Sequence, residues 1–331
     1  MKSFVAPFLL ISVMLSSSAF ADTSVLFNQL KNAKGVVNVE ACFSNERANY
    51  DGFISYSVKE LKQGGGSLMK SLTDERFKKR FKPAIYKRVK ASIDCYLFDY
   101  TVDDVVVAGY AVAQKGATKP QSLVINNRGG NGGFGRYAIV NMFSKLPLLK
   151  QGAIVMGSQY RQADEFGGAD IKDVNVLIDI GKSLAITKDE KIKMIGTSRG
   201  GMTSYMVAKT RDDIGKLVIK AGMSDLALGL TIRPEMERVY RARIPNYQVN
   251  KAAALQARSA IEWVDELDND IEILLIHGDA DKRVNVSQAQ NMAQKLKQLN
   301  RKHKLVVYPG GDHFLMAQKR KVNKEIIDWL F

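Results

Sequence analysis

From about residue 94 to the C-terminus, short apolar runs alternate with stretches of helical pattern. The runs carry Val, Ile and Leu in near-continuous order, as in ILLI at 273–276. Between the runs, apolar residues recur at helical spacing, as in Ile171, Val174 and Ile178. Apolar strands that alternate with helices are typical of a mostly parallel sheet covered by helices on both faces. The sequence therefore predicts an α/β fold with strands at 122–127, 153–160, 192–198, 216–222, 271–278 and 303–310.

The region before this alternation has a different character. Residues 22–92 are polar and mostly helical in pattern, with a glycine break at 64–66, and we expect them to form a small accessory segment. Residues 93–331 are expected to form the main domain, which opens with a β-hairpin that turns at 103–104. Within this domain, the less regular helical stretch 226–267 is expected to be a cap-like insertion.

The first residues have the pattern of an export signal. Lys2 is followed by an apolar run at 4–15 and by the small-residue pattern Ala19-Phe20-Ala21. A charged start, an apolar core and such a site are typical of a secretory signal peptide. We therefore expect cleavage near Ala21, which removes residues 1–21 and gives a periplasmic or secreted protein without stable membrane insertion. The alternative is an uncleaved anchor, although the apolar run is short for a bilayer.

Charge and cysteine content limit the partners and cofactors. The formal net charge is +15, with basic clusters at 76–90, 295–304 and 319–324. No nucleic-acid-binding motif accompanies them, so we interpret them as solvated faces, with weak attraction to an anionic cell envelope as the minor alternative. Cys42 and Cys95 form either one disulfide, as export allows, or two buried thiols. Neither has metal-ligand spacing, and we expect no metal and no organic cofactor.

The stretch KMIGTSRGG, residues 193–201, places a serine at a cramped corner. Gly196, Ser198 and Gly200 fit G-x-S-x-G directly after a predicted strand and before a predicted helix, which is the context of a nucleophile elbow. The glycines let strand and helix pass closely, and the hydroxyl lies at a helix N-terminus, where an oxyanion is stabilised. Ser198 is the predicted nucleophile. A structural Gly-Ser turn is the alternative until partners are found.

A serine hydroxyl is a weak nucleophile and needs a base, and the chain has three histidines. His277 ends a predicted strand, His303 lies in a lysine-rich turn, and His313 follows the last strand in the loop GGDHF at 310–314. In α/β-hydrolases the chain order is serine, acid, histidine. His313 fits this order and follows the carboxyl end of a strand, where such a site must lie. It is therefore the predicted general base.

The acid that orients the base is less easily chosen. Asp279 and Asp281 both follow the strand at 271–278, and spacing alone does not separate them. Asp312 is a poor candidate, because the side chains of adjacent residues rarely face each other.

Three motifs together resemble the catalytic domain of prolyl oligopeptidase-type serine peptidases. LLIHGDADKRV at 274–284 is similar to that family's H-G-x-x-D-x-x-V, GTSRGG at 196–201 to its G-x-S-x-G-G, and GGDHF to its histidine loop. The resemblance covers about residues 94–331 and implies an α/β-hydrolase fold. It also implies that Asp281 is the catalytic acid, supports Ser198 and His313 in their roles, and leaves His277 as a strand-end packing residue.

An oxyanion hole needs two N–H donors. One is expected to be the backbone N–H of Arg199, the residue after the nucleophile. The other is expected to be that of Arg128 or Gly129, in the glycine-rich stretch NNRGGNGGFG at 126–135. Arg128 stands where many relatives of the resembled family have a histidine.

Four further side chains are candidate substrate contacts. Tyr160 follows a predicted strand and could donate to the oxyanion or line the pocket. Arg161 and Glu165 could bind a substrate terminus, and a structural turn is the equally weighted alternative for all three. Trp263, in the helical insertion, either shapes the pocket or belongs to the core.

The resemblance implies a serine hydrolase that cleaves peptide bonds through an acyl-enzyme. The sequence contains no β repeat of ~40–50 residues such as a propeller needs, so the access filter and the proline or exopeptidase preference of full-length relatives are not carried over. One alternative is a carboxylesterase or dienelactone-hydrolase-like enzyme that acts on a small ester. Another is a non-catalytic hydrolase-fold binding protein, against which the retained serine, acid and histidine argue.

Overall fold

The computed structural model describes residues 24–331, apart from the side chains of residues 67 and 68. The predicted signal peptide and its cleavage site lie outside the described residues. The strands are β1 (Val36–Ala41), β2 (Ile93–Val102), β3 (Val105–Gln114), β4 (Ser122–Asn127), β5 (Ala153–Ser158), β6 (Ile192–Thr197), β7 (Ile214–Lys220), β8 (Glu272–Gly278) and β9 (His303–Tyr308).

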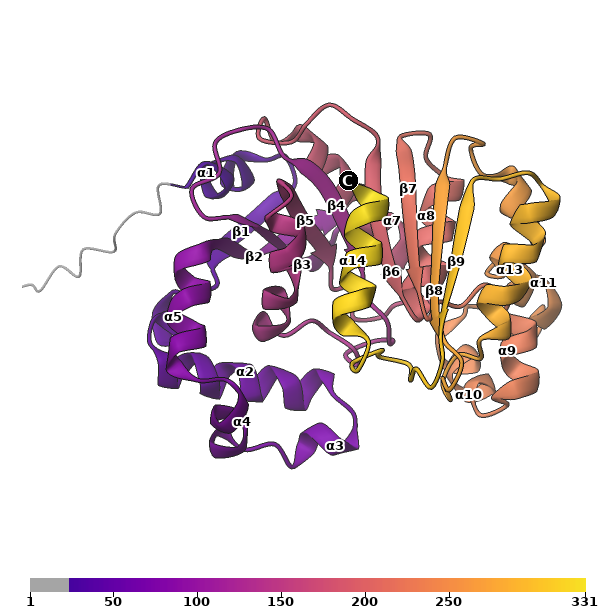
Figure 1. The fold of residues 1–331 in the computed structure, drawn as a ribbon, viewed down its shortest axis with the longest axis horizontal. Coiled ribbons are helices and arrows are strands. Elements are labelled where there is room, and N and C mark those ends of the chain that lie inside the picture. Colours follow the sequence, from indigo (N-terminus) through magenta and orange to yellow (C-terminus); the bar gives the residue numbers. More distant parts are fainter. Residues whose placement is uncertain (1–23) are drawn as a thin grey trace, which may run out of the picture.

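Helices precede the sheet in the chain and then alternate with its strands (Figure 1). The first group is α1 (Val25–Asn32), η1 (Asn45–Ala48), α2 (Tyr50–Gly64), α3 (Ser67–Lys70), α4 (Asp74–Arg80) and α5 (Pro83–Ser92). The second group is η2 (Ile139–Lys145), α6 (Leu146–Leu149), α7 (Asp170–Ser183), α8 (Arg199–Lys209), α9 (Leu226–Ile232), α10 (Met236–Arg243), α11 (Lys251–Gln256), α12 (Ala260–Trp263), η3 (Val264–Glu266), α13 (Ser287–Gln298) and α14 (Lys319–Leu330).

A nine-stranded sheet forms the centre of the molecule, in the order β1-β2-β3-β5-β4-β6-β7-β8-β9. The six strands from β5 to β9 in this order are parallel, whereas β1, β2 and β3 pair antiparallel at one edge. The predicted hairpin joins β2 and β3 through Asp103 and Asp104, which have φ values of 47° and 62°, as a tight type I′ turn requires. The predicted mostly parallel α/β sheet is confirmed.

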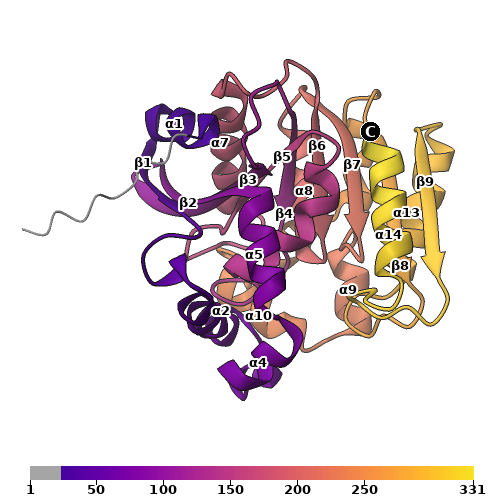
Figure 2. The ribbon, with the colours of Figure 1, turned by 60° about the vertical axis from the view of Figure 1, so that its left-hand side comes forward.

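Helices cover both faces of the sheet. Successive residues of a strand point to opposite faces, so each strand contributes side chains to two cores. On β7, Leu217 and Ile219 enter one core, which contains buried side chains of α1, α7, α8, α12 and α13. Val218 enters the other core, which contains those of α2, α5, α6 and α14. Figure 2 shows α5 and α14 on the same side of the sheet. Both sheet faces are therefore buried, which explains the continuous apolar strands.

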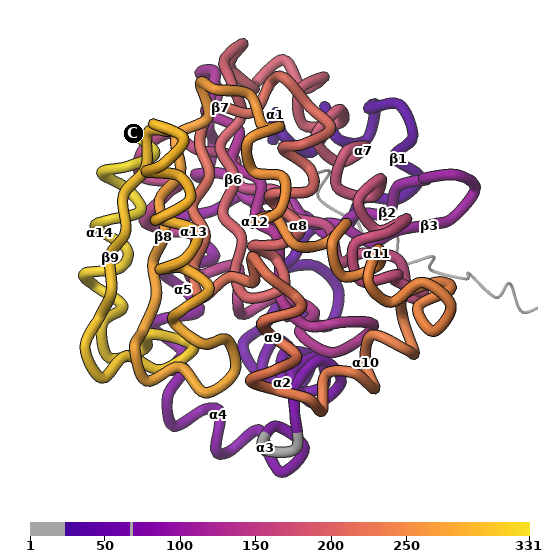
Figure 3. The backbone as a smooth tube through the Cα atoms, turned by 90° about the vertical axis from the view of Figure 1, so that its right-hand side faces the viewer, coloured from indigo at the N-terminus to yellow at the C-terminus, as the bar shows by residue number. Residues whose placement is uncertain are grey.

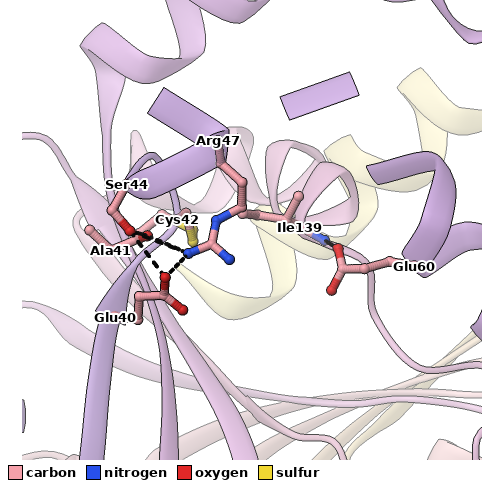
Figure 4. Close-up of a disulfide and its surroundings, with 8 residues drawn as sticks. Glu40, Ala41, Cys42, Ser44, Arg47, Glu60 and Ile139 are labelled. Carbon is pink, nitrogen blue, oxygen red and sulfur yellow. Dashed lines mark hydrogen bonds and ion pairs between the residues drawn. A yellow bond between two sulfur atoms is a disulfide. The ribbon is translucent and has the colours of Figure 1, made fainter. Parts of the chain in front are cut away.

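The segment before residue 93 contributes to the sheet as well as packing against it. β1 pairs with β2 at the sheet edge, a strand that the mainly helical pattern of this segment did not predict. Directly after β1, Cys42 forms a disulfide with Cys95 of β2, with the Cα atoms 5.3 Å apart (Figure 4). Beside it, the buried Arg47 donates to the Ala41 carbonyl at 3.2 Å and pairs with Glu40. Of the two alternatives for the cysteines, the structure has the disulfide.

Two groups of helices flank the edge of the sheet at which the parallel strands end. Figure 1 shows α2 and α3 at one end of this edge and α9 and α10 at the other, and Figure 3 shows the insertion helices α9–α12 from the side. The insertion has a small core of its own, which includes Leu226, Tyr240 and Leu255 and extends to Met202 of α8. This edge is where the candidate catalytic residues gather.

Candidate active site

Ser198 lies at the corner between β6 and α8. Its φ is 57° and its ψ −126°, a conformation that a residue with a side chain adopts only in a tightly constrained turn. A Cβ on Gly196 would collide with the Gly200 carbonyl and the Ser204 hydroxyl, and a Cβ on Gly200 would collide with the Asn127 carbonyl. Strand and helix therefore pass as closely as the nucleophile elbow demands.

The glycine-rich loop 128–135 passes next to Ser198. A Cβ added to Gly129 would lie 3.0 Å from Ser198 Cβ and 3.6 Å from Ser198 Oγ. Within the described residues, the backbone N–H groups of Gly129, Gly130 and Arg199 donate to no acceptor. The Arg199 N–H is one of those left free at the start of a helix. The expected donors at Gly129 and Arg199 are thus close to Ser198, and the N–H of Gly130, the next residue of the loop, is also without an acceptor among the described residues.

His313 and Asp281 form a buried pair on the loops after β9 and β8. His313 Nδ1 donates to Asp281 Oδ2 at 2.7 Å, and Asp281 Oδ1 accepts the N–H groups of Arg283 at 2.8 Å and Val284 at 3.0 Å. Burial raises the pKa of the Asp281 carboxyl, but hydrogen bonds from His277, His313 and Val284 outweigh it and hold that pKa well below its usual value. A charged carboxylate can therefore orient the imidazole.

The opposite nitrogen of His313, Nε2, is left to act as a base. No hydrogen bond reaches this atom or Ser198 Oγ in the part of the chain that the structure describes. With Nδ1 donating to Asp281, the neutral imidazole carries its free lone pair on Nε2. The structure thus brings the predicted acid and base together at the sheet edge that carries the serine.

His277 has a second role beyond the strand-end packing that the resemblance implied. Its side chain is fully buried at the end of β8, and its Nε2 donates to the Val284 carbonyl at 2.9 Å. The same nitrogen lies 3.4 Å from Asp281 Oδ2. His277 therefore supports the loop that carries Asp281, in addition to packing at the strand end. The signal was its place in the H-G-x-x-D motif, four residues before Asp281.

The other candidate acids and the third histidine are used elsewhere. Asp279 accepts the Gly310 N–H at 2.7 Å, and Asp312 accepts the Leu315 N–H at 2.7 Å, so both carboxylates shape turns. His303 begins β9, and its Nδ1 is bonded to the Arg301 carbonyl at 2.8 Å. It lies at the amino end of the parallel strands, away from Ser198.

Three of the four candidate substrate contacts already have partners within the chain. Tyr160 is 2% exposed, and its hydroxyl donates to the Arg128 carbonyl at 3.0 Å. Arg161 pairs with Asp173 at 2.7 Å. Glu165 accepts the Ala169 N–H at 2.7 Å. These contacts match the structural-turn alternative for the stretch 160–170.

Trp263, the fourth candidate, belongs to the core. It is 5% exposed, its Nε1 donates to the Gln256 carbonyl at 3.2 Å, and Lys209 lies 4.5 Å from its ring centroid. The insertion instead approaches the glycine-rich loop through Arg243, which donates to the Gln162 carbonyl at 3.4 Å and lies against Gly132.

Exposed apolar side chains lie on the loops around the candidate catalytic residues. Phe134 of the glycine-rich loop is 44% exposed, and Phe314, next to His313, is 51% exposed. Met316 and Ile232, on the loop after β9 and at the end of α9, are also exposed. Arg283 lies 4.9 Å from the Phe314 ring centroid. The only signal for these exposed residues in the sequence was an aromatic residue inside each of two motifs, Phe134 in the glycine-rich stretch and Phe314 in the histidine loop.

The N-terminal helices border the glycine-rich loop. The Gly135 N–H donates to the Gly64 carbonyl, the last residue of α2, at 2.7 Å. A cavity of about 290 Å³ between α2 and residues 136–138 is lined by Glu60, among others. The Glu60 carboxylate accepts the Ile139 N–H at 2.7 Å (Figure 4), and burial raises its pKa to about 7.

In residues 24–331, His, Cys, Asp and Glu side chains nowhere gather in a group of three or more that could hold a metal ion. Over the same residues, none of the helices is long and apolar enough to cross a membrane.

Comparison with known proteins identifies the family of the chain. Residues 151–331 match the profile of the prolyl oligopeptidase family. An uncharacterized peptidase, YtmA, of Bacillus subtilis (strain 168) is 23% identical over 207 residues, which is 60% of this chain and 80% of that relative. The region that matches the family profile, residues 151–331, contains Ser198, Asp281 and His313.

Solved structures show the same fold. The acylaminoacyl peptidase of Pyrococcus horikoshii is similar with a TM-score of 0.61 at 15% identity, over 73% of this chain and 41% of that one. Dipeptidyl peptidase 4 of Porphyromonas gingivalis is similar with a TM-score of 0.60 at 16% identity, over 75% of this chain and 37% of that one. The chain thus spans about two fifths of these solved peptidases.

Fold and site together define a serine hydrolase of the α/β-hydrolase type. Because the family profile covers more than half of the chain, the protein belongs to the prolyl oligopeptidase family, whose members are serine peptidases.

Proposed function

We propose that the protein cleaves peptide bonds through an acyl-enzyme. Ser198 Oγ attacks the scissile carbonyl carbon while His313 Nε2 takes the hydroxyl proton, and Asp281 holds the imidazolium that forms. The N–H groups of Arg199 and of the glycine-rich loop bind the oxyanion. The imidazolium then protonates the leaving amine as the C–N bond breaks. Water, deprotonated by His313, releases the acyl group.

The observation that carries this proposal is the buried Asp281–His313 pair at the same edge of the sheet as a serine with strained backbone geometry. A left-handed Ser198 with an unpaired hydroxyl has no structural purpose that a glycine would not serve better. The 2.7 Å hydrogen bond between His313 Nδ1 and Asp281 leaves the free lone pair on His313 Nε2, the atom that accepts the serine proton. The match to the family supports the same roles.

The substrate is proposed to present an apolar side chain near the scissile bond. Phe134 and Phe314 extend from the loops that carry the oxyanion donors and the base, and each exposes over two fifths of its surface. Exposed aromatic side chains beside a polar centre favour apolar substrate groups. The polar atoms of Tyr160, Arg161 and Glu165 are already bonded within the chain, so specificity for a charged terminus through them is not proposed.

Export is proposed from the signal-peptide pattern of residues 1–21, and the disulfide is a further support. A buried disulfide between Cys42 and Cys95 is stable in oxidising compartments such as the periplasm or the extracellular space. N-terminal sequencing of the protein recovered from its host would test this. A mature chain that begins near Asp22 supports export, whereas an intact Met1 in the cytoplasmic fraction contradicts it.

The test of the activity is a digest of a diverse peptide library by the wild type and by Ser198→Ala, with products identified by mass spectrometry. Cleavage by the wild type alone supports a serine peptidase, and the residues flanking the cuts test the apolar preference. Hydrolysis of activated esters through Ser198 without any peptide cleavage would contradict the peptidase assignment and identify an esterase.

A further inference from the structure

Arg199, the expected first donor of a backbone N–H to the oxyanion hole, and Arg128, one of the two alternatives for the second donor, also have buried side chains. Arg128 and Arg199 are each 1% exposed. A buried guanidinium is costly unless its donors are paired, so the partners of each side chain show what it does.

Arg128 binds backbone carbonyls, not an acid. Within the described residues, no carboxylate lies at ion-pair distance from it. Burial lowers the pKa of its guanidinium to about 10, so the group stays charged at neutral pH. Its three nitrogens donate to the carbonyls of Gly129 (3.0 Å), Gly132 (2.9 Å), Phe134 (3.0 Å) and Gln159 (2.6 and 3.1 Å). The glycine-rich loop is thus wrapped around one side chain.

Arg199 holds the same loop from the side of the nucleophile. Its Nη1 donates to the Gly130 carbonyl at 2.9 Å. Its guanidinium also pairs with Asp164 at 2.9 Å and Asp170 at 2.5 Å, and Asp164 accepts the N–H of Gly132 in turn. The side chain that follows Ser198 is therefore tied to the loop opposite.

Tyr160 lies against both arginines. The centroid of its ring is 4.6 Å from the guanidinium carbon of Arg128 and 5.1 Å from that of Arg199, distances at which a cation is attracted to the ring face. Its hydroxyl donates to the Arg128 carbonyl. Its φ is 55°, a conformation that costs free energy for a tyrosine and persists only where the surroundings impose it.

These contacts fix three consecutive peptide planes of the glycine-rich loop. The carbonyls of Arg128, Gly129 and Gly130 are bound by Tyr160, Arg128 and Arg199 respectively. The peptide bonds are trans, and in a trans peptide the N–H of the next residue points opposite to the carbonyl. The N–H groups of Gly129 and Gly130 are therefore turned away from the side chains that hold the carbonyls.

We propose that the side chains of Arg128, Tyr160 and Arg199 form a clamp that preorganises the oxyanion hole by holding the N–H groups of Gly129 and Gly130 toward Ser198. The proposal rests on the proposed function. The three side chains are positioning residues, since they act through the backbone. It also places the second donor at Gly129 or Gly130, and it gives Tyr160 a role other than direct donation to the oxyanion.

Arg128→Lys tests the clamp, because lysine keeps the charge but cannot reach four carbonyls with a planar fork. The matched control is Arg301→Lys. Arg301 is also buried and also donates to backbone carbonyls, those of Leu267 and Asp268 at 2.8 and 2.5 Å, but it lies at the amino end of the strands. Comparison of the two variants separates the effect of losing a buried arginine from the effect of losing the oxyanion geometry.

The measurements are kcat and KM on a peptide that the wild type cleaves, the rate of labelling of Ser198 by a fluorophosphonate, and the thermal midpoint. We expect Arg128→Lys to lower kcat and the labelling rate by about 10²-fold with KM nearly unchanged, as loss of an oxyanion donor does. Arg301→Lys should lower the thermal midpoint and leave kcat unchanged. An Arg128→Lys protein that is folded and keeps wild-type kcat would overturn the clamp.

Tyr160→Phe gives a second test if Arg128→Lys does not fold, because it removes only the hydroxyl. A folded Tyr160→Phe with lower kcat, slower labelling and unchanged KM supports the clamp, and wild-type kcat overturns it. The wild-type control separates failure of the clamp from failure of the proposed function. A wild type that neither reacts with the fluorophosphonate nor cleaves peptides refutes the proposed function, whereas an active wild type with fully active clamp variants refutes the clamp alone.

Discussion

The disulfide between Cys42 and Cys95 should stabilise the protein by about 4 kcal/mol. The bond joins residues 53 apart in sequence, and closing a loop of that length in the unfolded chain removes an entropy worth about 4 kcal/mol. The loop contains α2–α5, whose buried side chains fill much of one core. Loss of the disulfide should therefore destabilise the helices that border the glycine-rich loop as well as the sheet edge.

Chemical denaturation of the oxidised and the reduced wild type measures this contribution as a free energy, and thermal melting measures it as a shift in midpoint, because reduction changes the bond and leaves every side chain in place. A destabilisation of about 4 kcal/mol lowers the melting midpoint of a chain of this size by roughly 8 °C. A Cys42→Ala/Cys95→Ala variant is the control, since its midpoint should not respond to reductant. Well below the melting midpoint, kcat should be unchanged, because Gly64 still contacts Gly135.

A difference below about 1 kcal/mol between the oxidised and reduced forms would refute the entropic argument. It would mean that the unfolded chain already holds residues 42 and 95 close together. An equal response to reductant in the control variant would place the effect outside this bond.

Three further outcomes are expected. Asp281→Asn should fold but lose about 10³–10⁴-fold in kcat, because the amide no longer holds His313 in the required tautomer; a kcat near that of the wild type would assign the acid elsewhere. Phe314→Ala should raise KM for peptides with apolar residues at the cut more than for those with polar residues; equal changes in KM would exclude a specificity role. Glu60→Gln should gain stability over the wild type at pH 8 and lose that gain at pH 5. The reason is that native Glu60 keeps its proton up to about pH 7 while the unfolded chain releases it near 4.5, so the wild type loses stability as the pH rises through this window. Denaturant midpoints at both pH values check this, and a gain independent of pH would contradict it.

The strands of the parallel sheet could be predicted because each is buried on both faces and so reads as a continuous apolar run. β1 was missed for the opposite reason. It is an edge strand whose residues are half-buried or exposed, and its short valine-rich run VVNVEA, interrupted by Asn38 and Glu40, is outweighed by the helical pattern of the residues around it. The disulfide likewise depends on that pairing, which brings residues 53 apart together.

The positions of Ser198 and His313 at the carboxyl ends of strands could be predicted because each residue belongs to a motif at the end of a strand. Asp281 needed the family resemblance, since Asp279 lies two residues away on the same loop. Both carboxylates accept hydrogen bonds, but only that of Asp281 accepts one from His313. The difference lies in the course of the loop, which residue spacing does not specify.

The contacts of Tyr160, Arg128 and Arg199 could not be predicted, because they join three separate loops. Arg128 and the Gln159 carbonyl are 31 residues apart, and Arg199 and the Gly130 carbonyl are 69 apart. Polar side chains at the ends of adjacent strands are expected to meet, but which carbonyl each donor binds depends on the turn of each loop. For this reason Tyr160 looked like a substrate contact in the sequence.

The central claim, that Ser198 is a nucleophile served by His313 and Asp281, is tested most directly by mapping a fluorophosphonate adduct. The folded wild type, Ser198→Ala and His313→Ala are each treated with the probe and digested, and the modified residue is identified by mass spectrometry. We predict one adduct in the wild type, on Ser198, none in Ser198→Ala, and labelling of Ser198 that is greatly slowed in His313→Ala. An adduct on another residue, or labelling of Ser198 at an undiminished rate without His313, would contradict the claim.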